Sequence, residues 1–314
     1  MNQFPFFVEE VLMGDKRAVA KAISFVENGE NGKIEFLHKI FKNRKNGYRI
    51  GITGPPGAGK STITAKLAIL YRNLGFRVGI IAVDPTSPFT GGALLGDRVR
   101  MSEIELDKNI FIRSMASRGS LGGLSNSTSE VVDILDSAGF EIILIETVGV
   151  GQSELDIVRA ADTTIVTLVP ESGDVIQAMK AGLMEIADLF ILNKSDRPGS
   201  EQAVMSIQTV LGLREHDEKS WIPKIIKTVA TEGKGIEKII SAVDEHKNKL
   251  ISNGLFKIKR IEREKERIEE LVNSKLSNSF WSEEKKNLLN KFLPDLIENK
   301  LTPYELIEKI FQEK

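Results

Sequence analysis

Short apolar runs alternate with segments of helical periodicity from about residue 47 to residue 252 of this 314-residue chain. The runs predict strands at 48–53, 77–83, 110–115, 140–146, 163–169, 189–192 and 224–229. Such alternation is typical of an α/β fold with a mostly parallel sheet and helices on both faces. Ligands of such folds bind at the carboxyl ends of the strands.

The first 46 residues predict a helical arm packed on this domain. Apolar residues recur there at helical spacing in three stretches, at 8–12, 19–26 and 34–41, separated by a turn at 28–32. A floppy leader would not need this periodicity, so the arm is the favoured interpretation. We expect three parts in the chain: an arm at 1–46, the α/β domain at 47–252 and a helical module at 253–314.

The C-terminal module begins with a densely charged stretch at 257–270 that keeps one apolar stripe, formed by Ile258, Ile261, Ile268 and Leu271. Two further helices are predicted over 282–292 and 302–311, with Ser282 and Thr302 as N-caps and Pro294 separating them. A charged helix is usually a solvated face. The retained stripe instead suits a partner helix or a dimer surface.

The most specific motif directly follows the first strand and opens a helix at 63–74. It fits the pattern G-x-x-x-x-G-K-[ST] of a phosphate-binding loop and consists of Gly54, Pro55, Pro56, Gly57, Ala58, Gly59, Lys60, Ser61 and Thr62. The glycines let the backbone N–H groups face the β- and γ-phosphates, and the helix start adds its positive dipole end. We expect Lys60 to contact those phosphates and Ser61 to bind Mg²⁺.

A second motif reads the base. Asn193, Lys194, Ser195 and Asp196 fit N-K-x-D, the guanine-reading sequence of P-loop GTPases. A carboxylate at Asp196 accepts both the N1–H and the exocyclic amine of guanine, a donor pair that adenine lacks. Alone, the tetrapeptide could be an ordinary turn, but after a phosphate loop and a strand it predicts GTP over ATP. The next strand ends in the last base-contacting loop, at Val229, Ala230 and Thr231.

Acidic residues end two further strands. Asp84 and Glu146 lie where an acid can hold Mg²⁺ directly or through water. A helix-capping role fits Asp84 poorly, because Pro85 follows it. Gly149 follows Glu146 closely and could donate its N–H to the γ-phosphate, so that this loop rearranges on hydrolysis.

A long loop at 84–101 is rich in turn residues, and long loops at a ligand-binding edge are commonly functional. Asp97 could bind metal-bound water or orient the attacking water, and Arg98 could offset charge on the phosphoryl group. The two could equally form a local ion pair.

Composition narrows the remaining possibilities. The 43 basic and 44 acidic residues nearly cancel, which argues against a nucleic-acid coat or a membrane-surface protein. The chain has no cysteine, so disulfides, thiolate metal sites and a cysteine nucleophile are excluded. Three histidines, His38, His216 and His246, are too scattered to indicate a zinc site. No apolar run is long enough to span a bilayer, and a cytoplasmic protein is expected.

These motifs together resemble the MeaB/ArgK family of P-loop GTPases, which includes the methylmalonic aciduria type A protein. The resemblance covers nearly the whole chain and is carried by residues 54–62, 84–101, 146–154, 170–188 and 193–196. It implies a G domain of the SIMIBI class, GTP and GDP as ligands with Mg²⁺, slow hydrolysis that a partner stimulates, and a homodimer formed through the C-terminal helices.

The resemblance further implies a chaperone of adenosylcobalamin-dependent methylmalonyl-CoA mutase that gates cofactor loading and protects or reactivates the mutase. Within 170–188, which resembles the segment called switch III, Asp174 and Lys180 are candidates for relaying the nucleotide state. The family carries Ser-Ala in its last base loop where this chain has Val229-Ala230, although a backbone contact survives that change.

Other functions remain to be weighed. A metal-insertion GTPase would need a cluster of Cys and His donors, which the sequence lacks. A kinase or ATPase linked to amino-acid transport binding proteins would usually read adenine, which N-K-x-D disfavours. An inactive phosphate-loop scaffold is disfavoured because Lys60, Ser61, Asp84 and Glu146 are all present. A chaperone of another acyl-CoA mutase stays open.

Overall fold

The computed structural model describes residues 4–85, 104, 106–117, 126–147, 153–171, 182–213 and 220–312. It divides into two compact units, 1–260 and 261–314. Among the described helices, none combines the length and the apolar character needed to cross a bilayer.

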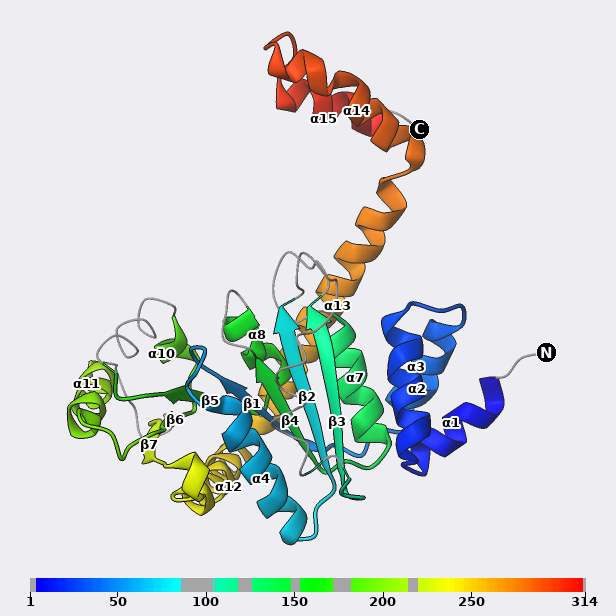
Figure 1. Ribbon diagram of the computed structural model, residues 1–314. Helices are drawn as coiled ribbons and strands as arrows, with labels where there is room; N and C mark the ends of the chain where they lie inside the picture. The colour runs from blue at the N-terminus through cyan, green and yellow to red at the C-terminus, as the bar shows by residue number, and fades with distance from the viewer. Residues whose placement is uncertain are drawn as a thin grey trace. The chain divides into compact units, whose positions relative to one another are not determined.

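The first unit is built on a seven-stranded parallel sheet in the order β3-β2-β4-β1-β5-β6-β7 (Figure 1). The strands are β1 (Tyr48–Thr53), β2 (Val78–Pro85), β3 (Ile110–Ser117), β4 (Ile142–Thr147), β5 (Thr163–Leu168), β6 (Leu189–Leu192) and β7 (Lys224–Lys227). The predicted α/β class and the predicted strands are confirmed. The first strand in the sequence lies in the middle of the sheet, so the residues that follow it are flanked on both sides.

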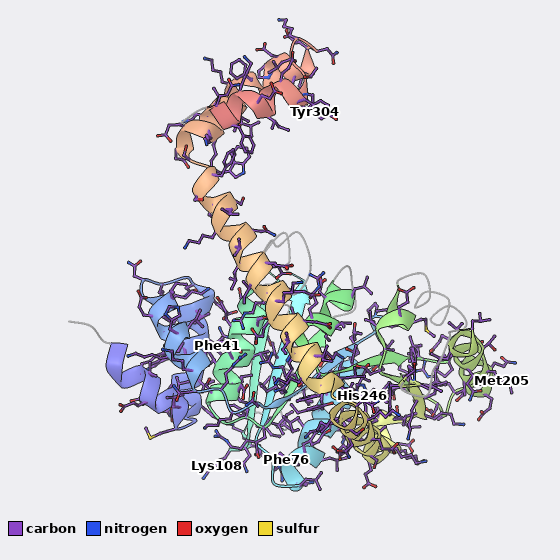
Figure 2. The ribbon with its side chains drawn as sticks, turned by 180° about the vertical axis from the view of Figure 1, so that it is seen from behind. Phe41, Phe76, Lys108, Met205, His246 and Tyr304 are labelled. Atoms are coloured by element: carbon purple, nitrogen blue, oxygen red, sulfur yellow. The ribbon has the colours of Figure 1, made fainter. Side chains whose placement is uncertain are left out.

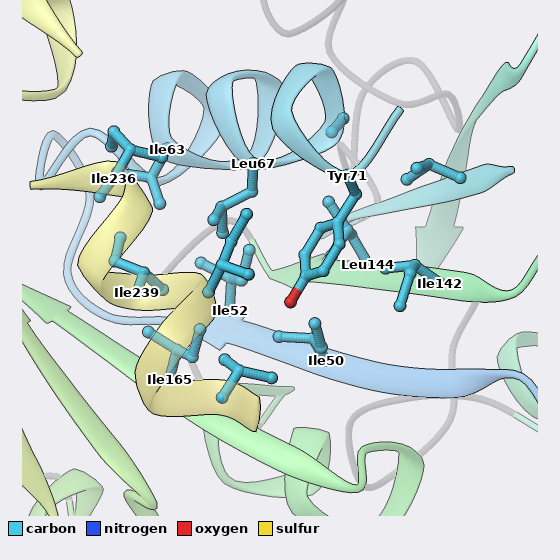
Figure 3. Close-up of a cluster of buried hydrophobic side chains, with 14 of the residues drawn as sticks. Ile50, Ile52, Ile63, Leu67, Tyr71, Ile142, Leu144, Ile165, Ile236 and Ile239 are labelled. Atoms are coloured by element: carbon cyan, nitrogen blue, oxygen red, sulfur yellow. The ribbon is translucent and has the colours of Figure 1, made fainter. Parts of the chain in front are cut away.

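Helices cover both faces of this sheet, as expected from strands that are buried on both sides. One face carries α4 (Lys60–Asn73) and α12 (Ile236–Ser252), which pack on residues such as Ile50, Ile52 and Leu144 (Figure 3). The other carries α7 (Asn126–Ser137), α8 (Ser153–Ala160), α10 (Leu183–Ile186) and α11 (Ser200–Gly212). Neighbouring strand residues alternate between the faces, because side chains along a strand point in opposite directions.

The predicted helical arm consists of α1 (Phe4–Leu12), α2 (Lys16–Glu27) and α3 (Lys33–Lys42). Its periodic apolar residues share a cluster with those of α7. Ion pairs add to this contact: Lys33 lies 2.8 Å from Glu130, and Arg44 lies 3.0 Å from Asp133. The arm is therefore part of the first unit.

The chain continues through α13 (Leu255–Phe280), α14 (Glu283–Ile297) and α15 (Pro303–Gln312). Ser282 caps α14 by accepting from the Lys285 N–H at 3.3 Å. Thr302 and Glu305 form a reciprocal capping box at the start of α15, with contacts of 2.8 and 3.2 Å. Both predicted caps are present.

The prediction that Pro294 separates the last two helices is wrong. Pro294 lies inside α14, which continues to Ile297. A proline inside a helix lacks an N–H and its ring crowds the preceding turn, yet the helix continues past Pro294, whose carbonyl accepts from the Glu298 N–H at 3.0 Å. The helix ends instead near Asn299, whose φ of 57° is the left-handed conformation typical of a helix C-terminus.

Candidate nucleotide site

The predicted phosphate loop connects the central strand β1 to the start of α4. Gly54 has a φ of 134° and Gly59 a φ of 91°, a region that other residues rarely adopt. Space is limiting as well: a Cβ on Gly54 would collide with the Thr167 carbonyl, and one on Gly59 with the Asn193 amide. The two glycines thus permit both the backbone turn and its close packing on β5 and β6.

Two side chains at the start of α4 lie within this loop. The Lys60 ammonium donates to the carbonyl oxygens of Gly54 at 2.7 Å and Pro55 at 2.9 Å, so it lies across the mouth of the loop. The Ser61 hydroxyl donates to Glu146 Oε1 at 2.6 Å. Glu146 is buried at the end of β4, so the structure brings this predicted acid directly to the phosphate loop.

Asn193 joins the two predicted halves of the site. Its amide Nδ2 donates to the Ala58 carbonyl in the phosphate loop at 2.8 Å. Its Oδ1 accepts from the Thr228 hydroxyl and from the Ala230 N–H, each at 3.1 Å. One buried amide therefore holds the phosphate loop and the last base loop in a fixed relation.

The N-K-x-D segment leaves the end of β6 in a turn, with Lys194 at a φ of 55°. Asp196 is exposed, so its carboxylate is accessible to a base. The Ser195 N–H and hydroxyl both donate to the Thr228 carbonyl at 3.0 Å. In the last base loop, η1 (Ala230–Glu232) follows Val229, whose N–H donates to the Lys234 carbonyl at 3.1 Å.

Sequence reasoning did not predict how several hydroxyl side chains brace this site. Thr228 and Ser195 connect the two base loops, and Thr147 donates to Thr53 at 2.9 Å between the ends of β4 and β1. The sequence offered one signal for them: each of these hydroxyl residues lies in or next to a motif at the end of a strand. Their partners depend on strand order, which the motifs do not give.

Arg197 and Glu171 form an ion pair beside the N-K-x-D turn. Sequence reasoning did not predict this pair. Slight burial acts to raise the pKa of Glu171. Hydrogen bonds from its own backbone and from Arg197 outweigh that effect, so the pKa of Glu171 lies below its ordinary value. Glu171 is therefore a carboxylate at neutral pH, and the pair ties the end of β5 to the base-reading turn.

Some predicted residues cannot be located in this arrangement. Asp97, Gly149, Asp174 and Lys180 lie outside the described residues, and of Asp84 only the backbone, at the end of β2, is described. The other predicted residues, including Thr62 and Thr231, lie at the carboxyl edge of the sheet or at the start of α4.

The described donors suit Mg²⁺ better than a metal caged by protein. Across the part of the chain that the structure describes, no three acidic, histidine or cysteine side chains converge as a metal site. Mg²⁺ commonly takes one or two protein ligands and completes its shell with phosphates and water. The contact between Ser61 and Glu146 offers such a hydroxyl with a carboxylate behind it.

A central strand, a glycine loop and a helix start, braced through Asn193 to an N-K-x-D turn, define the class of P-loop nucleotide-binding proteins with a guanine-type base site. Comparison with known proteins supports this class. The family described as methylmalonyl-CoA mutase-associated GTPase MeaB matches residues 19–285. The chain belongs to this family and is a GTPase.

Relatives from an archaeon, a bacterium and the mouse also match this chain over most of its length. A putative GTPase of Pyrococcus abyssi is 43% identical over 98% of this chain and 95% of its own length. The GTPase ArgK of Escherichia coli is 32% identical over 88% of this chain and 86% of its own. The mitochondrial methylmalonic aciduria type A homolog of mouse is 34% identical over 80% of this chain and 64% of its own.

A solved structure has the same fold over almost the whole chain. It is a crystal structure titled LAO/AO transport system kinase, with a TM-score of 0.73 and 25% identity, covering 98% of this chain and 95% of that one. The fold class expected from the sequence, a P-loop GTPase with a helical C-terminal region, is therefore confirmed.

Proposed function

We propose that this GTPase is a chaperone of adenosylcobalamin-dependent methylmalonyl-CoA mutase, gating cofactor loading and protecting or reactivating that enzyme. The observation that carries the proposal is the match of residues 19–285 to a family described as associated with this mutase. The bracing by Asn193 supports the nucleotide binding on which this role depends, because it fixes the distance between the phosphate loop and the base loop.

In this proposal each motif residue has a defined task. The N–H groups of residues 54–62 and the Lys60 ammonium bind the β- and γ-phosphates. Asp196 accepts from the guanine N1–H and amine, and Lys194 packs along the base. The Val229 N–H already donates to the Lys234 carbonyl and the Ala230 N–H to Asn193 Oδ1, so the Thr231 N–H is the candidate for the guanine O6.

Mg²⁺ would supply positive charge between the β- and γ-phosphates. Ser61 would be its direct protein ligand, and Glu146, with Asp84 and Asp97, would hold its water shell. Glu146 accepts from the Ser61 hydroxyl, which orients the oxygen lone pairs of Ser61 away from the carboxylate. Gly149, Asp174 and Lys180 keep the sensing and relaying tasks that the family resemblance implies.

We also propose that residues 253–314 form a dimerisation module. None of the 26 residues of α13 is buried, and its apolar stripe (Ile258, Ile261, Ile268 and Leu271) is at least 44% exposed. A long helix with an unburied apolar stripe gains stability by packing on another helix. Size-exclusion chromatography with light scattering measures the oligomeric state directly.

Steady-state GTP hydrolysis, with and without a cobalamin-dependent methylmalonyl-CoA mutase, tests the chaperone function. We expect the mutase to raise the rate about tenfold or more, which corresponds to ~1.4 kcal/mol of transition-state stabilisation. No rise, together with no complex in gel filtration, would refute this client and direct attention to other acyl-CoA mutases. Competition between GTP and ATP in the same assay separates a GTPase from a kinase that uses ATP.

A further inference from the structure

A buried carboxylate fastens the first turns of α13 at the amino ends of the strands, opposite the phosphate loop. Asp162 is 1% exposed. Its Oδ1 accepts from Arg260 Nε at 3.1 Å and its Oδ2 from Arg260 Nη2 at 2.7 Å. The same Nη2 donates to the Gly47 carbonyl at 2.9 Å. This two-pronged geometry fixes the direction of the guanidinium as well as its distance.

Two neighbours in α13 strengthen this attachment. Lys259 donates to the Asp162 carbonyl at 3.0 Å and lies 3.4 Å from the Asp188 carboxylate. Phe256 stacks on Tyr48 with the ring centroids 6.1 Å apart. Asp188 also accepts from the Thr164 N–H at 2.8 Å and faces His246 of α12, which Figure 2 labels. The start of α13 is thus held by directional polar contacts to Gly47, Asp162 and Asp188, the residues that directly precede β1, β5 and β6.

Asp162 is also connected to the nucleotide site by two routes. It follows the end of α8 by two residues, and α8 begins six residues after β4, which ends beside Glu146. Its N–H donates to the Arg49 carbonyl at 2.8 Å, and its Oδ2 accepts from the Arg49 N–H at 3.0 Å. Arg49 lies in β1, the strand that leads to the phosphate loop.

The helix α8 packs closely on β1, and its hydrogen-bonding pattern continues to the residue before Asp162. Ile157 lies so close to Gly51 of β1 that a Cβ on this glycine would be 2.7 Å from the Ile157 side chain. The Ala161 N–H continues the helical pattern to the Ile157 carbonyl at 3.1 Å, so the residue before Asp162 is still attached to the helix. A close-packed interior has low compressibility, so a small displacement of one element displaces the elements that pack on it.

We propose that Asp162 and Arg260 form a coupling joint, which passes nucleotide-dependent displacements of α8 and β1 to the start of α13. Both are positioning residues, since neither lies at the nucleotide site. The inference rests on the proposed binding of GTP, because bound nucleotide and Mg²⁺ would change the contact between Ser61 and Glu146 at the end of β4. The output is α13, the helix that carries the exposed apolar stripe.

Chemistry favours a joint over a simple anchor. A buried ion pair contributes little more stability than apolar side chains of the same volume would. Its distinguishing property is direction, since the paired groups tolerate few alternative arrangements. An apolar contact at this place would keep α13 against its neighbours without fixing its direction or its position along its own axis.

Hydrogen–deuterium exchange on the full-length protein tests the joint, with GDP or a non-hydrolysable GTP analogue at saturating concentration. In the wild type we expect the amides of residues 255–263 to exchange at rates differing about threefold or more between the two nucleotides. In Asp162→Asn this difference is expected to vanish, while nucleotide still protects the phosphate loop. Lys257→Ala, an exposed position on the same turn, is the matched control and should behave as wild type.

The outcomes separate the joint from the proposed function. A nucleotide-dependent difference that persists in Asp162→Asn, or that is absent in the wild type although the phosphate loop is protected, overturns the joint alone. A phosphate loop that neither nucleotide protects overturns both. If circular dichroism finds Asp162→Asn unfolded, Arg260→Lys carries the test, because it keeps a cation beside Asp162 and removes the two-pronged geometry. It should reduce the difference.

Discussion

Residues 1–260 and residues 261–314 bury their apolar side chains to very different extents. The first region holds three apolar clusters spread over both faces of the sheet and the arm. In the second region, as far as it is described, the helices bury only Leu306 and Ile310. Large apolar side chains there that are at least 43% exposed include Ile261, Ile268, Leu271, Val272, Leu276, Leu293, Ile297, Tyr304, Ile307 and Phe311.

This difference separates a region that folds by its own burial from one that has apolar surface left to bury. Removing apolar surface from water contributes roughly 25 cal/mol for each Å². The second region leaves much of that stabilisation unused within one chain, which supports the proposed dimer. Five experiments, ordered by the size of the expected effect, would test where each region obtains its stability and which of its residues act on the nucleotide.

A matched pair of apolar truncations tests the comparison most directly. Leu67 is fully buried between α4 and the sheet, whereas Ile268 on α13 is 59% exposed. Leu67→Ala should lower the free energy of unfolding by about 3 kcal/mol through lost burial and a cavity. Ile268→Ala should change the unfolding of the monomer by less than about 0.5 kcal/mol and weaken dimerisation instead. Denaturant unfolding and light scattering measure the two effects, and equal losses of stability would contradict the comparison.

Lys60→Ala should weaken nucleotide binding by the first region and leave the oligomeric state, which we attribute to the second region, unchanged. Loss of the ammonium that we propose contacts the phosphates should weaken GTP binding about 100-fold, or ~2.7 kcal/mol. Isothermal titration calorimetry measures the affinity, and light scattering checks that the oligomeric state is unchanged. Near-normal affinity would rule out the assigned phosphate contact.

Asp196→Asn tests the base contact in the same region. Replacing the carboxylate by an amide should weaken GTP binding by roughly 2 kcal/mol, because two charge-assisted hydrogen bonds are lost. Binding of xanthosine triphosphate should improve, since its extra carbonyl suits an amide donor. Ser195→Ala, which keeps the carboxylate, is the control for disturbance of the turn. An unchanged base preference would refute the assignment.

His246 gives the first region a pH dependence near neutral pH, and residues 261–314 contain no histidine. Burial lowers the pKa of His246 below its ordinary value, and the effects of Asp188 and Asp162 oppose this while Lys259 adds to it. The unfolded chain therefore binds the proton first, and stability is lost as pH falls below about 6.5. This contribution changes by at most about 1.4 kcal/mol per pH unit.

The measurement is the free energy of unfolding at pH 7.5 and 5.5. His246→Gln should lose less stability between these pH values than the wild type. His38→Gln, an exposed position on α3, is the control. The same loss in His246→Gln and in the wild type would show that another group causes it.

Thr302→Ala should have the smallest effect, confined to the second region. It removes the hydroxyl that accepts from the Glu305 N–H in the capping box of α15. A lost N-cap costs about 1 kcal/mol, so amides of α15 should exchange faster while those of β1 and β4 do not change. Faster exchange throughout the first region would mean that the two regions are more strongly coupled than their burial suggests.

Much of the fold and of the nucleotide site could be predicted because the signals are local. Strand periodicity gave the sheet, and each motif is contiguous in sequence. Some side-chain details were less accessible: the helix predicted at 63–74 buries Tyr71, whereas Leu74 at the end of that range is 62% exposed. The helix ends at Asn73, so Leu74 leaves the helical pattern.

Contacts between distant residues could not be predicted. The pairing of Asp162 with Arg260 depends on the order of strands in the sheet and on where α13 begins, and neither follows from hydrophobic periodicity. The bracing role of Thr228 has the same origin, because its partner Asn193 lies on a neighbouring strand. The prediction for Pro294 was wrong because it applied the rule that a proline ends a helix, whereas α14 continues through this proline.

The central position of β1 has a consequence for the order in which the protein can assemble. The strand before the phosphate loop is synthesised first, but both of its hydrogen-bonded neighbours, β4 and β5, come from residues 142–168. A growing chain therefore carries its whole phosphate-binding sequence long before that sequence has a sheet to hold it. Nascent or truncated chains that end before β5 should be unable to bind GTP, although they contain every residue from Gly54 to Thr62.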